Sequence, residues 1–420
     1  MLDIDLIRND PDRVRASLRD RNYPEQLLDE FLRIDGEWRK LIDEGNHLKY
    51  ERNRASETVP KLKGEEKQKV IGEMRRISDR IKHIDTMVHE LEEARTEIVL
   101  NFPNLPDASV PKGKDPADNV VVRTFGAPRP FDFVPKKHYE LGEDLDIIDF
   151  VRGAKVTGSG FFVLKGDGAR LDRALTQYML DLHHRQGYVE VFPPAIVNTA
   201  AVIGTGQYPK MKDDMYWCER DDLWLNPTAE VPVTNLHQDE IFEKGQLPLS
   251  YTAYLPSFRR EAGRSADTRG IIRVHQFNKV ELVKFVFPGT SSHDLEVLRS
   301  DAEAVLQGLE LPYRVLLLCT GDMGFASAKT YDLEAFAPGQ EQWLEVSSCS
   351  CFTDFQARRA RIKFRPEAHL KSEFVHTLNG SGLALPRTMV AVMENYQNKD
   401  GTITVPKILR PYMQGQEIIE

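Results

Sequence analysis

The sequence predicts an α+β protein in which an antiparallel sheet flanked by helices follows a long antiparallel α-helical coiled-coil arm. Two observations predict this class. Apolar residues recur every three or four positions through most of the N-terminal quarter, whereas the remainder alternates short apolar, β-branched runs with polar turns and scattered helical stretches. We therefore expect a helical domain over residues 1–105, with its arm at about 27–100, and a sheet domain over residues 106–420.

The composition is that of a globular protein with more than one folding unit. The chain has 420 residues, of which 41% are hydrophobic, and it carries a net charge of -9. Such a length exceeds what one compact core usually accommodates. The longest apolar runs, such as residues 315–319, are too short to cross a membrane, and the N-terminus is acidic where a signal peptide would be basic. We expect a cytoplasmic protein with reduced cysteines.

The predicted arm consists of two helical seams joined by a turn. The first seam is formed by Leu27, Phe31, Ile34, Trp38, Leu41, Gly45, Leu48, Arg52, Ala55 and Val59, and the second by Val70, Met74, Ile77, Ile81, Ile84, Val88, Leu91, Arg95 and Ile98. Spacings of four and three alternate along both seams, which is typical of a coiled coil. Pro60 and Gly64 break the helix between them, so the seams are expected to fold back on each other as a hairpin.

The turn of this hairpin carries an excess of positive charge. Its cations are Lys61, Lys63, Lys67, Lys69, Arg75 and Arg76, and its acids are Glu65, Glu66 and Glu73. A basic tip on a long lever suits a polyanion such as RNA, even though the net charge of the whole chain is negative. The periodicity alone favours a dimerisation coil, and the charges also fit a solvated face, so the residues leave these alternatives open.

The sheet domain begins after residues 102–113, which are rich in proline and glycine. Residues 187–192, 313–319 and 273–281 show the apolar pattern of strands with one face buried and the other lining a cleft. Glycines near position 160 complete neither G-x-G-x-x-G nor the G-K-[ST] phosphate loop. Any nucleotide must therefore be held by side chains.

Side chains suited to binding a nucleotide lie within residues 273–281 and in the segment that precedes them. Arg259 can fork onto a phosphate or carboxylate, Glu261 can accept from an adenine amino group, and Phe277 offers a flat face to a base. Alone, Phe277 would be interpreted as a core residue and Arg273 as a surface charge. Because Phe277 occurs together with Arg259 and Glu281, it indicates a binding site instead.

Two oxygen-bearing side chains, Glu345 and Ser348, are expected at the end of an apolar strand over residues 343–346. Magnesium accepts such a partial set of hard oxygen ligands and keeps water and phosphate oxygens at its other positions. An isolated glutamate is usually a solvated charge, so this assignment depends on the neighbouring motifs. The histidines show neither metal spacing nor a nucleophile partner.

Four segments thus indicate one chemistry, the joining of a carboxylate to a nucleotide phosphate. They are Thr228-Ala229-Glu230, Phe258-Arg259-Arg260-Glu261, Glu345-Val346-Ser347-Ser348, and Asn379-Gly380-Ser381-Gly382 followed by Arg387. With these segments the chain resembles a bacterial-type seryl-tRNA synthetase, a class II aminoacyl-tRNA synthetase, over essentially its whole length. Residues 187–194, 258–281 and 379–387 resemble the three class motifs.

The resemblance implies a serine-tRNA ligase that uses ATP and Mg²⁺, acts on tRNA(Ser), and also charges tRNA(Sec) where that tRNA exists. It implies a homodimer with the first motif at its interface, an arm that grips the long variable arm of the tRNA, and neither a membrane nor a DNA partner. Carried over by position, Arg259 binds the α-phosphate and the substrate carboxylate, and Arg387 binds the far phosphates of a bent ATP. These two arginines are the expected catalytic residues.

The remaining site residues are also implied by the resemblance. The expected ATP contacts are Arg259, Arg260, Glu261, Arg273, Val274, Phe277, Glu345, Val346, Ser347, Ser348 and Arg387. The expected serine contacts are Thr228, Ala229, Glu230, Arg259, Glu281 and Ser381, and the expected magnesium ligands are Glu345 and Ser348.

The chain departs from the commonest family pattern at two places. The loop over residues 262–268 is a residue shorter, and Arg260 replaces a frequent serine. Both lie where the tRNA acceptor end would approach, which puts the contacts with that end in question.

Two other functions remain open. One is a ligase that loads an amino acid on a carrier protein, whose members resemble the sheet domain without the arm. The other is a non-catalytic RNA-binding paralogue, which would have lost an arginine or a magnesium ligand. The sequence retains both arginines and both ligands.

Overall fold

The structure, a computed structural model, describes residues 1–262, 269–367 and 369–420. The chain forms two compact units, one of residues 2–102 and one of residues 103–420 together with Met1. In the described part of the chain, every helix is too short or too polar to cross a lipid bilayer.

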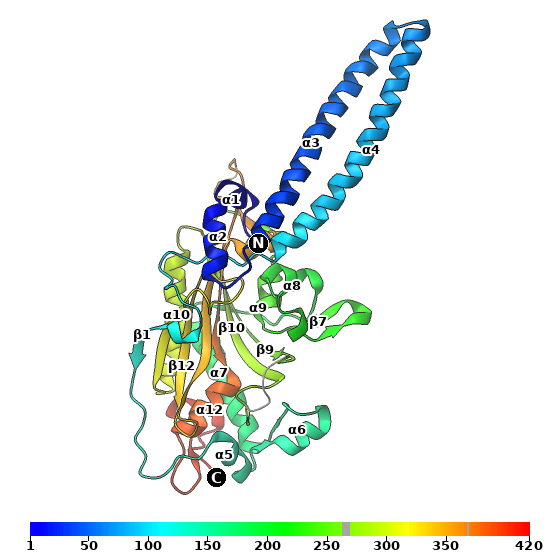
Figure 1. Cartoon of the computed structure of the whole chain (residues 1–420). Helices are drawn as coiled ribbons and strands as arrows, with labels where there is room; N and C mark the ends of the chain where they lie inside the picture. The colour runs from blue at the N-terminus through cyan, green and yellow to red at the C-terminus, as the bar shows by residue number, and fades with distance from the viewer. Residues whose placement is uncertain (263–268, 368) are drawn as a thin grey trace. The chain divides into compact units, whose positions relative to one another are not determined.

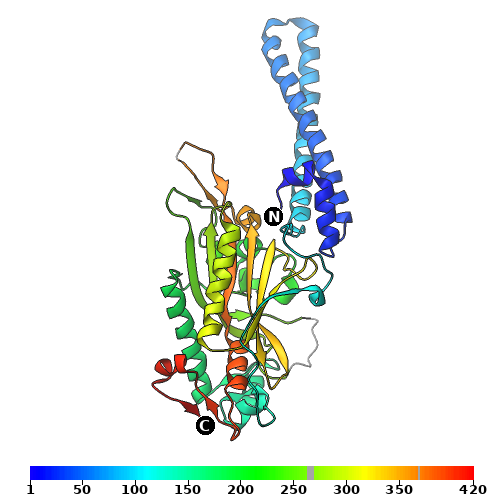
Figure 2. The same ribbon diagram turned by 90° about the vertical axis from the view of Figure 1, so that its left-hand side faces the viewer.

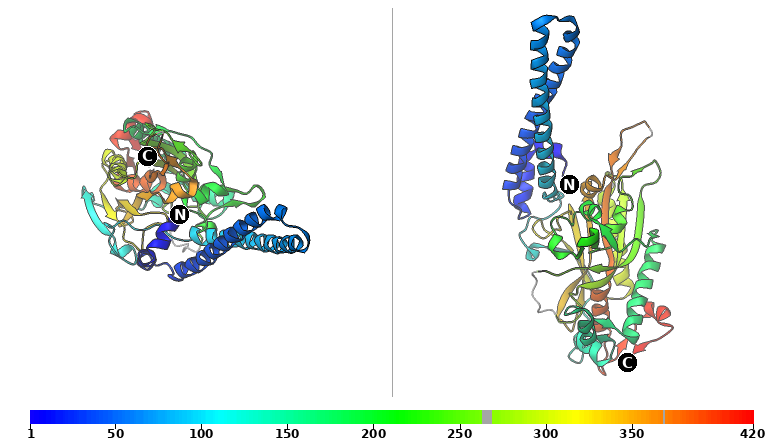
Figure 3. Two further views of the ribbon diagram at one scale, coloured as in Figure 1. Left: turned by 90° about the horizontal axis from the view of Figure 1, so that it is seen from above. Right: turned by 90° about the vertical axis from the view of Figure 1, so that its right-hand side faces the viewer.

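The smaller unit is helical (Figure 1). Two short helices, α1 (Ile4–Asn9) and α2 (Pro11–Asp20), precede the long helices α3 (Gln26–Thr58) and α4 (Gly64–Leu100), and the 3-10 turn η1 (Val59–Lys61) connects the long pair. Figures 1 and 3 show α3 and α4 side by side in every view. Pro60 lies in η1, and Gly64 has a φ of +61°, which favours glycine. The predicted antiparallel hairpin and its turn are confirmed.

A glycine in the first seam allows the two long helices to approach closely. A Cβ at Gly45 would lie 3.3 Å from the Cγ2 atom of Ile84 on the opposite helix. The seam is tighter at its base, where Phe31 is fully buried and meets Phe102 edge to face, with ring centroids 6.0 Å apart. The apolar periodicity of the sequence therefore corresponds to real side-chain packing.

Arg95, the arginine in the second seam, is largely buried and is paired with an acidic side chain. Its guanidinium lies 4.0 Å above the ring of Trp38, and Arg95 Nη1 lies 3.3 Å from Asp35 Oδ1. The Asp35 side chain is 4% exposed and also pairs with Arg8 Nη2 at 2.7 Å. A buried ion-pair cluster thus ties α1, α3 and α4 together at the base of the hairpin.

The larger unit is built on an eight-stranded sheet with the order β1-β11-β12-β13-β16-β10-β9-β4. The strands, in this order, are Val120–Phe125, Tyr313–Leu317, Lys329–Ala337, Gln342–Thr353, His376–Ala384, Gln276–Val286, Leu249–Phe258 and Val189–Glu190. Neighbouring strands pair antiparallel except β4 and β9, which are parallel. The predicted α+β class with a largely antiparallel sheet is confirmed.

Helices cover both faces of this sheet. The helices α7 (Gly166–Arg185), α10 (Ser291–Gly308) and α12 (Leu385–Asn395) pack on one face, as Figure 2 shows, and enclose the main apolar core. The short helices α9 (Glu230–Asn235) and α11 (Phe355–Ala360) pack on the other face, and α8 (Thr199–Thr205) contacts both. Alternate residues of β10 enter the two cores, with Leu282 in the first and Val283 in the second.

Smaller elements complete the larger unit. Two of them are the helices α5 (His138–Asp144) and α6 (Phe150–Thr157). Two small sheets have three strands each, in the orders β5 (Ile196–Asn198), β7 (Leu223–Leu225), β6 (Trp217–Cys218) and β15 (Glu373–Phe374), β14 (Lys363–Phe364), β8 (Ile241–Phe242). Two more are strand pairs, β2 (Ile148–Asp149) with β3 (Val163–Leu164) and β17 (Ile403–Thr404) with β18 (Ile418–Ile419).

Four expected strands differ in extent from the observed ones, and the run over residues 313–319 ends two residues early, as β11 (Tyr313–Leu317). The run over residues 187–192 pairs only at Val189–Glu190, because this strand has a single neighbour and two prolines follow it. The run over residues 273–281 enters the sheet only at Gln276. Glu345 and Ser348 lie within β13 rather than at a strand end, because pairing with β12, and further on with β16, continues the strand to Thr353.

Candidate active site

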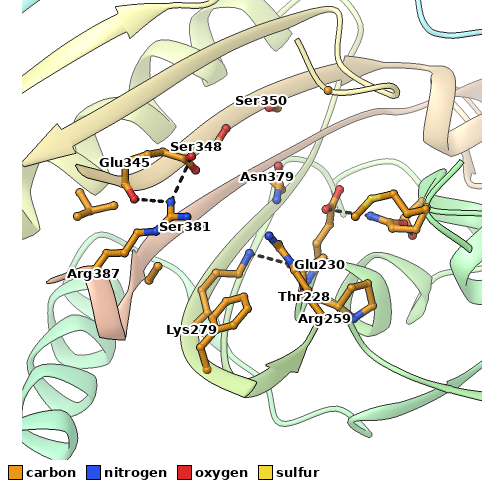
Figure 4. A pocket seen from close by; sticks show the side chains of 18 of the residues that line it. Thr228, Glu230, Arg259, Lys279, Glu345, Ser348, Ser350, Asn379, Ser381 and Arg387 are labelled. Atoms are coloured by element: carbon orange, nitrogen blue, oxygen red, sulfur yellow. Dashed lines mark hydrogen bonds and ion pairs between the residues drawn. The ribbon is translucent and has the colours of Figure 1, made fainter. Parts of the chain in front are cut away.

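A cavity of about 410 Å³ opens where the central strands β10, β13 and β16 meet the loop before α9 and the start of α12. This volume suits a small ligand. The sequence-predicted residues that line it are Thr228, Glu230, Arg259, Glu261, Arg273, Val274, Phe277, Glu345, Val346, Ser348, Ser381 and Arg387. Figure 4 shows side chains from these separate segments facing one space.

The register of the sheet explains why distant segments meet here. β16 lies between β10 and β13, so Ser381 pairs with Glu281 on one side, while Asn379 pairs with Ser350 on the other. Strand alternation then places residues two apart on the same face, as for Phe277 and Lys279, which both line the cavity. The predicted third motif ends in α12, whose first turn carries Arg387.

One end of the cavity is formed by Arg387, Glu345 and Ser348 (Figure 4). Arg387 Nη1 donates to the backbone oxygen of Glu345 at 2.8 Å and lies 3.3 Å from its carboxylate oxygen Oε2. Arg387 Nε donates to the backbone oxygen of Ile272 at 3.2 Å. These bonds fix the guanidinium in the opening, where it can contact phosphate oxygens.

The same end holds more negative than positive charge. Asp332 on β12 faces Ser348 across the ladder, and its Oδ1 atom is buried without a hydrogen-bond partner among the described residues. Burial and the nearby Glu345 raise the pKa of Asp332 well above its usual value, and burial also raises the pKa of Glu334. A divalent cation held by the oxygens of Glu345 and Ser348 would relieve this repulsion.

Arg259 occupies the middle of the cavity wall. Its guanidinium lies 5.2 Å from the ring centroid of Phe277, and its Nε donates to the backbone oxygen of Pro227 at 3.2 Å. Burial lowers the pKa of Arg259 from its usual value, while Glu345 and Glu261 act in the opposite direction. A desolvated cation so placed would bind an anion strongly.

The other end is a buried hydrogen-bond network around Glu281. Thr228 Oγ1 donates to Glu281 Oε2 at 2.6 Å, and Asn379 Nδ2 donates to Glu281 Oε1 at 2.9 Å. Lys279 Nζ lies 2.5 Å from Glu281 Oε2 and donates to Thr228 Oγ1 at 2.8 Å. Both oxygens of Glu281 are therefore engaged, and the hydroxyl and amide groups above them present a polar surface to a small ligand.

Glu230 adds a second buried carboxylate to this end. Burial and the nearby charge of Glu281 raise the pKa of Glu230 to about 7. Its oxygens accept from amide nitrogens, from Gln356 Nε2 at 2.6 Å and from Gln207 Nε2 at 3.4 Å. Among the described residues it forms no ion pair. An ammonium group would satisfy its charge.

Four sequence-predicted residues do not line the cavity. Glu281 and Ser347 lie beneath the lining, where Ser347 Oγ donates to the backbone oxygen of Ser381 at 2.6 Å, and Ala229 is fully buried. Arg260 faces a separate surface pocket, where its Nη1 donates to the backbone oxygen of Asp213 at 3.1 Å. Successive residues after a strand point to different sides, so Arg259 and Arg260 diverge. Of the predicted acceptor-end loop, residues 263–268 lie outside the described residues.

Several lining residues were not predicted from the sequence. Lys279 and Asn379 were within reach, because Lys279 stands midway between Phe277 and Glu281 in an alternating run and Asn379 opens the third motif. Thr205 ends α8 and Gln207 lies in the loop that follows, and no local signal in the sequence marks either residue. Only the tertiary fold brings that loop to the cavity.

Known proteins match both units. A family model described as the seryl-tRNA synthetase N-terminal domain matches residues 1–106, and one described as the tRNA synthetase class II core domain (G, H, P, S and T) matches residues 216–396. A serine-tRNA ligase of Methanosarcina barkeri is 55% identical, with 100% of this chain and 99% of the relative aligned.

Solved structures are similar over the whole length. The crystal structure of seryl-tRNA synthetase from Pyrococcus horikoshii complexed with ATP has a TM-score of 0.96 and 39% identity, covering 100% of this chain and 99% of that one. The cytoplasmic serine-tRNA ligase from Naegleria fowleri in complex with AMP has a TM-score of 0.90 and 30% identity, with the same coverage. Both relatives hold an adenine nucleotide.

Proposed function

Because the chain belongs to the seryl-tRNA synthetases of class II, we propose that its cavity joins L-serine to ATP and then transfers the seryl group to the 3' end of tRNA(Ser). The observation that carries this proposal is the convergence of Arg259, Arg387, Glu345 and Glu230 on one cavity of suitable volume. The enzyme is a ligase that forms an aminoacyl-tRNA ester.

In the first step a serine carboxylate oxygen attacks the α-phosphorus of ATP. The bond from that phosphorus to the bridging oxygen breaks, and seryl-adenylate and pyrophosphate form. Arg259 neutralises the α-phosphate and orients the carboxylate, while Arg387 takes the distal phosphates. Phe277 stacks on the adenine and Glu261 accepts from its amino group. No protein nucleophile is required.

Glu345 and Ser348 are the residues that would hold Mg²⁺. Their oxygens suit a hard cation that keeps water and phosphate oxygens as its other ligands, and within the described residues no group of three or more acidic, histidine or cysteine side chains forms a complete metal site. When bound, the ion neutralises the charge that develops on the leaving pyrophosphate. Burial, and after it the charge of Glu345, raises the pKa of Asp332, and a cation beside Glu345 would relieve that repulsion.

The polar end of the cavity selects serine. Glu230 pairs with the substrate ammonium, and Thr228, Asn379 and Ser381 surround the hydroxymethyl group. A site that hydrogen-bonds a substrate hydroxyl rejects the analogue without it by a factor of about 10⁴ or more in the best cases, so alanine is excluded. The buried Glu281 acts by holding Thr228 and Asn379 in place.

In the second step a hydroxyl of the terminal ribose of the tRNA attacks the acyl carbonyl, and AMP leaves. The basic turn of the helical hairpin, where Lys61, Lys63 and Lys69 are exposed, binds the long variable arm of the tRNA. The enzyme also charges tRNA(Sec) where the host has one, and it acts in the cytoplasm, where its tRNA substrates are.

The homodimer forms through the first class motif. The strand β4 ends the main sheet, and its neighbourhood exposes apolar side chains, with Val189 at 53% and Phe192 at 83%. Such a surface suits burial against a second copy. The expected mass in sedimentation is that of a dimer, and a monomer at micromolar concentration would contradict it.

Serine-dependent exchange of pyrophosphate into ATP tests the assignment of the cavity. We expect Arg259→Ala to reduce the exchange rate by about 10²-fold or more, the range for loss of one group that stabilises transition-state charge. Arg260→Ala is the matched control, because the neighbouring arginine faces away from the cavity and should leave exchange near wild type. Exchange by Arg259→Ala at near wild-type rate would make the site assignment wrong.

Two alternative functions can be distinguished from tRNA ligation by testing which molecule accepts the seryl group. A ligase for a carrier protein would show exchange but would not charge tRNA(Ser), and a non-catalytic paralogue would bind tRNA without exchange. Aminoacylation of tRNA(Ser) with and without its variable arm decides between them. The helical hairpin and the retained Arg259, Arg387 and Glu345 favour the tRNA ligase.

A further inference from the structure

Gln356, in the short helix α11, lies behind the cavity wall rather than in it. Gln356 is 1% exposed and is not among the residues that line the cavity. Gln356 Nε2 donates to Glu230 Oε1 at 2.6 Å and to the backbone oxygen of Thr205 at 3.1 Å. Its Oε1 accepts from Thr377 Oγ1 at 2.7 Å. The amide thus connects a cavity carboxylate with α8 and β16.

These three bonds fix the orientation of the amide. The backbone oxygen of Thr205 can only accept, so the Gln356 nitrogen must face it. A flipped amide would oppose its oxygen to that carbonyl and to the Glu230 oxygen, both of which are acceptors. The donor is therefore held toward Glu230 by the Thr205 carbonyl and the Thr377 hydroxyl.

The partners of Glu230 stabilise its charge without neutralising it. Gln356 and Gln207 are uncharged, whereas Lys279, one of the cations that act on Glu230, is engaged with Glu281 at 2.5 Å. A cationic partner in place of Gln356 would compete with a ligand cation for the same carboxylate. Two neutral amides orient the buried carboxylate and leave its charge to be paired by an incoming ammonium.

We propose that Gln356 is the positioning residue for amino-acid recognition, since its amide holds Glu230 in the conformation and charge state that bind the substrate ammonium. The proposal rests on the function proposed above. Thr377 supports it by anchoring the amide oxygen, and Gln207 is the second, longer donor to the same carboxylate. The charged groups that act on Glu230 are Glu281, Lys279 and Arg259.

The test measures serine and ATP separately in the exchange reaction of the full chain. We expect Gln356→Met, which keeps the volume and removes the donor, to raise the KM for serine by about 10- to 100-fold, the effect of losing one hydrogen bond to a charged acceptor. The KM for ATP should stay within about threefold. Thr377→Val should give a smaller increase in the KM for serine, because it removes only the anchor of the amide.

The pH profile supplies a second readout. Without the amide donor, the pKa of Glu230 should rise further, so the acidic limb of kcat/KM for serine should move to higher pH. Gln356→Glu is the charged companion, which preserves shape and places a carboxylate against Glu230. It should give the largest loss of serine affinity and also keep the KM for ATP.

Gln397→Met is the matched control. Gln397 is also 1% exposed and also makes three bonds, since its Nε2 donates to Lys136 O at 3.0 Å and to Glu394 O at 2.9 Å and its Oε1 accepts from Lys136 N at 2.8 Å. It lies outside the cavity lining. It should lower thermal stability as much as Gln356→Met does, without a selective change in the KM for serine.

The outcomes separate this inference from the proposed function. A parallel rise of both KM values, or an unmoved pH limb, would overturn the role of Gln356 and leave it a structural residue. If Gln356→Met does not fold, Thr377→Val and Gln356→Glu decide by the same criteria. If the wild-type chain shows no serine-dependent exchange, or if Glu230→Gln leaves the KM for serine unchanged, the function proposed for the cavity fails first.

Discussion

The clearest stability prediction concerns Lys279→Met, which removes one partner of the buried ion pair between Lys279 and Glu281. The two side chains are 8% and 0% exposed, and their charged atoms lie 2.5 Å apart. Methionine fills a similar volume without the charge. The substitution therefore removes one partner and leaves Glu281 buried, with only Thr228 and Asn379 as hydrogen-bond donors.

The magnitude follows from the burial and the distance. At an effective dielectric constant of about 20, two unit charges at this separation attract by about 7 kcal/mol, and most of that attraction offsets the cost of desolvating them. Removing one partner of a buried pair costs about 3–5 kcal/mol, because the other charge remains uncompensated. We expect Lys279→Met to reduce the free energy of unfolding of the larger unit by this amount.

The second substitution Glu281→Gln, added to Lys279→Met, tests the cause. A glutamine oxygen would still accept from Asn379 Nδ2, and its nitrogen could donate to the Thr228 hydroxyl that Lys279 no longer occupies. The double variant should therefore be more stable than Lys279→Met alone, by about 2 kcal/mol. Denaturant titration followed by tryptophan fluorescence suits the measurement, since Trp217, Trp224 and Trp343 lie in the larger unit. A double variant no more stable than the single one would refute the reasoning from uncompensated charge.

Three further predictions concern the two substrates and the ion. Below about pH 7 the protonation of Glu230 should reduce kcat/KM for serine about tenfold per pH unit, because the raised pKa leaves the carboxylate neutral there; a flat profile between about pH 5.5 and 8.5 would contradict it. Glu345→Gln should raise the Mg²⁺ concentration for half-maximal exchange about tenfold, and an unchanged Mg²⁺ titration would refute the ligand assignment. Joint replacement of Lys61 and Lys63 by glutamate should raise the KM for tRNA(Ser) about tenfold and flatten its salt dependence, while an equal loss of pyrophosphate exchange would show that the change is not confined to the arm.

The sequence was sufficient for features that depend on local periodicity. The helical hairpin follows from a seam that continues without interruption, and its turn follows from Pro60 and Gly64. Arg95 shows the limit of that approach. A charged residue in a seam can be interpreted as a break, and only the structure shows that Trp38 and Asp35 enclose it.

The site was predictable where a functional residue lies in a recognisable motif, and less so where tertiary contacts decide. Arg259 and Arg387 were found because forked donors stand in segments that resemble known motifs. Arg260 was assigned to the same site by the family resemblance, but its side chain faces Asp213. Gln356 left no trace, because a single buried amide acquires its role only when α11 packs behind α8 and α9.

The electrostatic pattern of the cavity explains why one site handles both substrates. At one end burial and the charge of Glu345 raise the pKa of Asp332 and of Glu334, and at the other end burial and the charge of Glu281 raise the pKa of Glu230. Arg259 interacts with both ends, since Glu345 opposes the lowering of its pKa by burial, and Arg259 opposes the rise in the pKa of Glu230. From one end of the cavity to the other, its wall is thus negative, positive and negative. This order of charges is complementary to a metal ion, an α-phosphate with its attacking carboxylate, and an ammonium group. Each substrate therefore relieves a different repulsion, and the carboxylate and phosphate that must react are drawn to the same guanidinium.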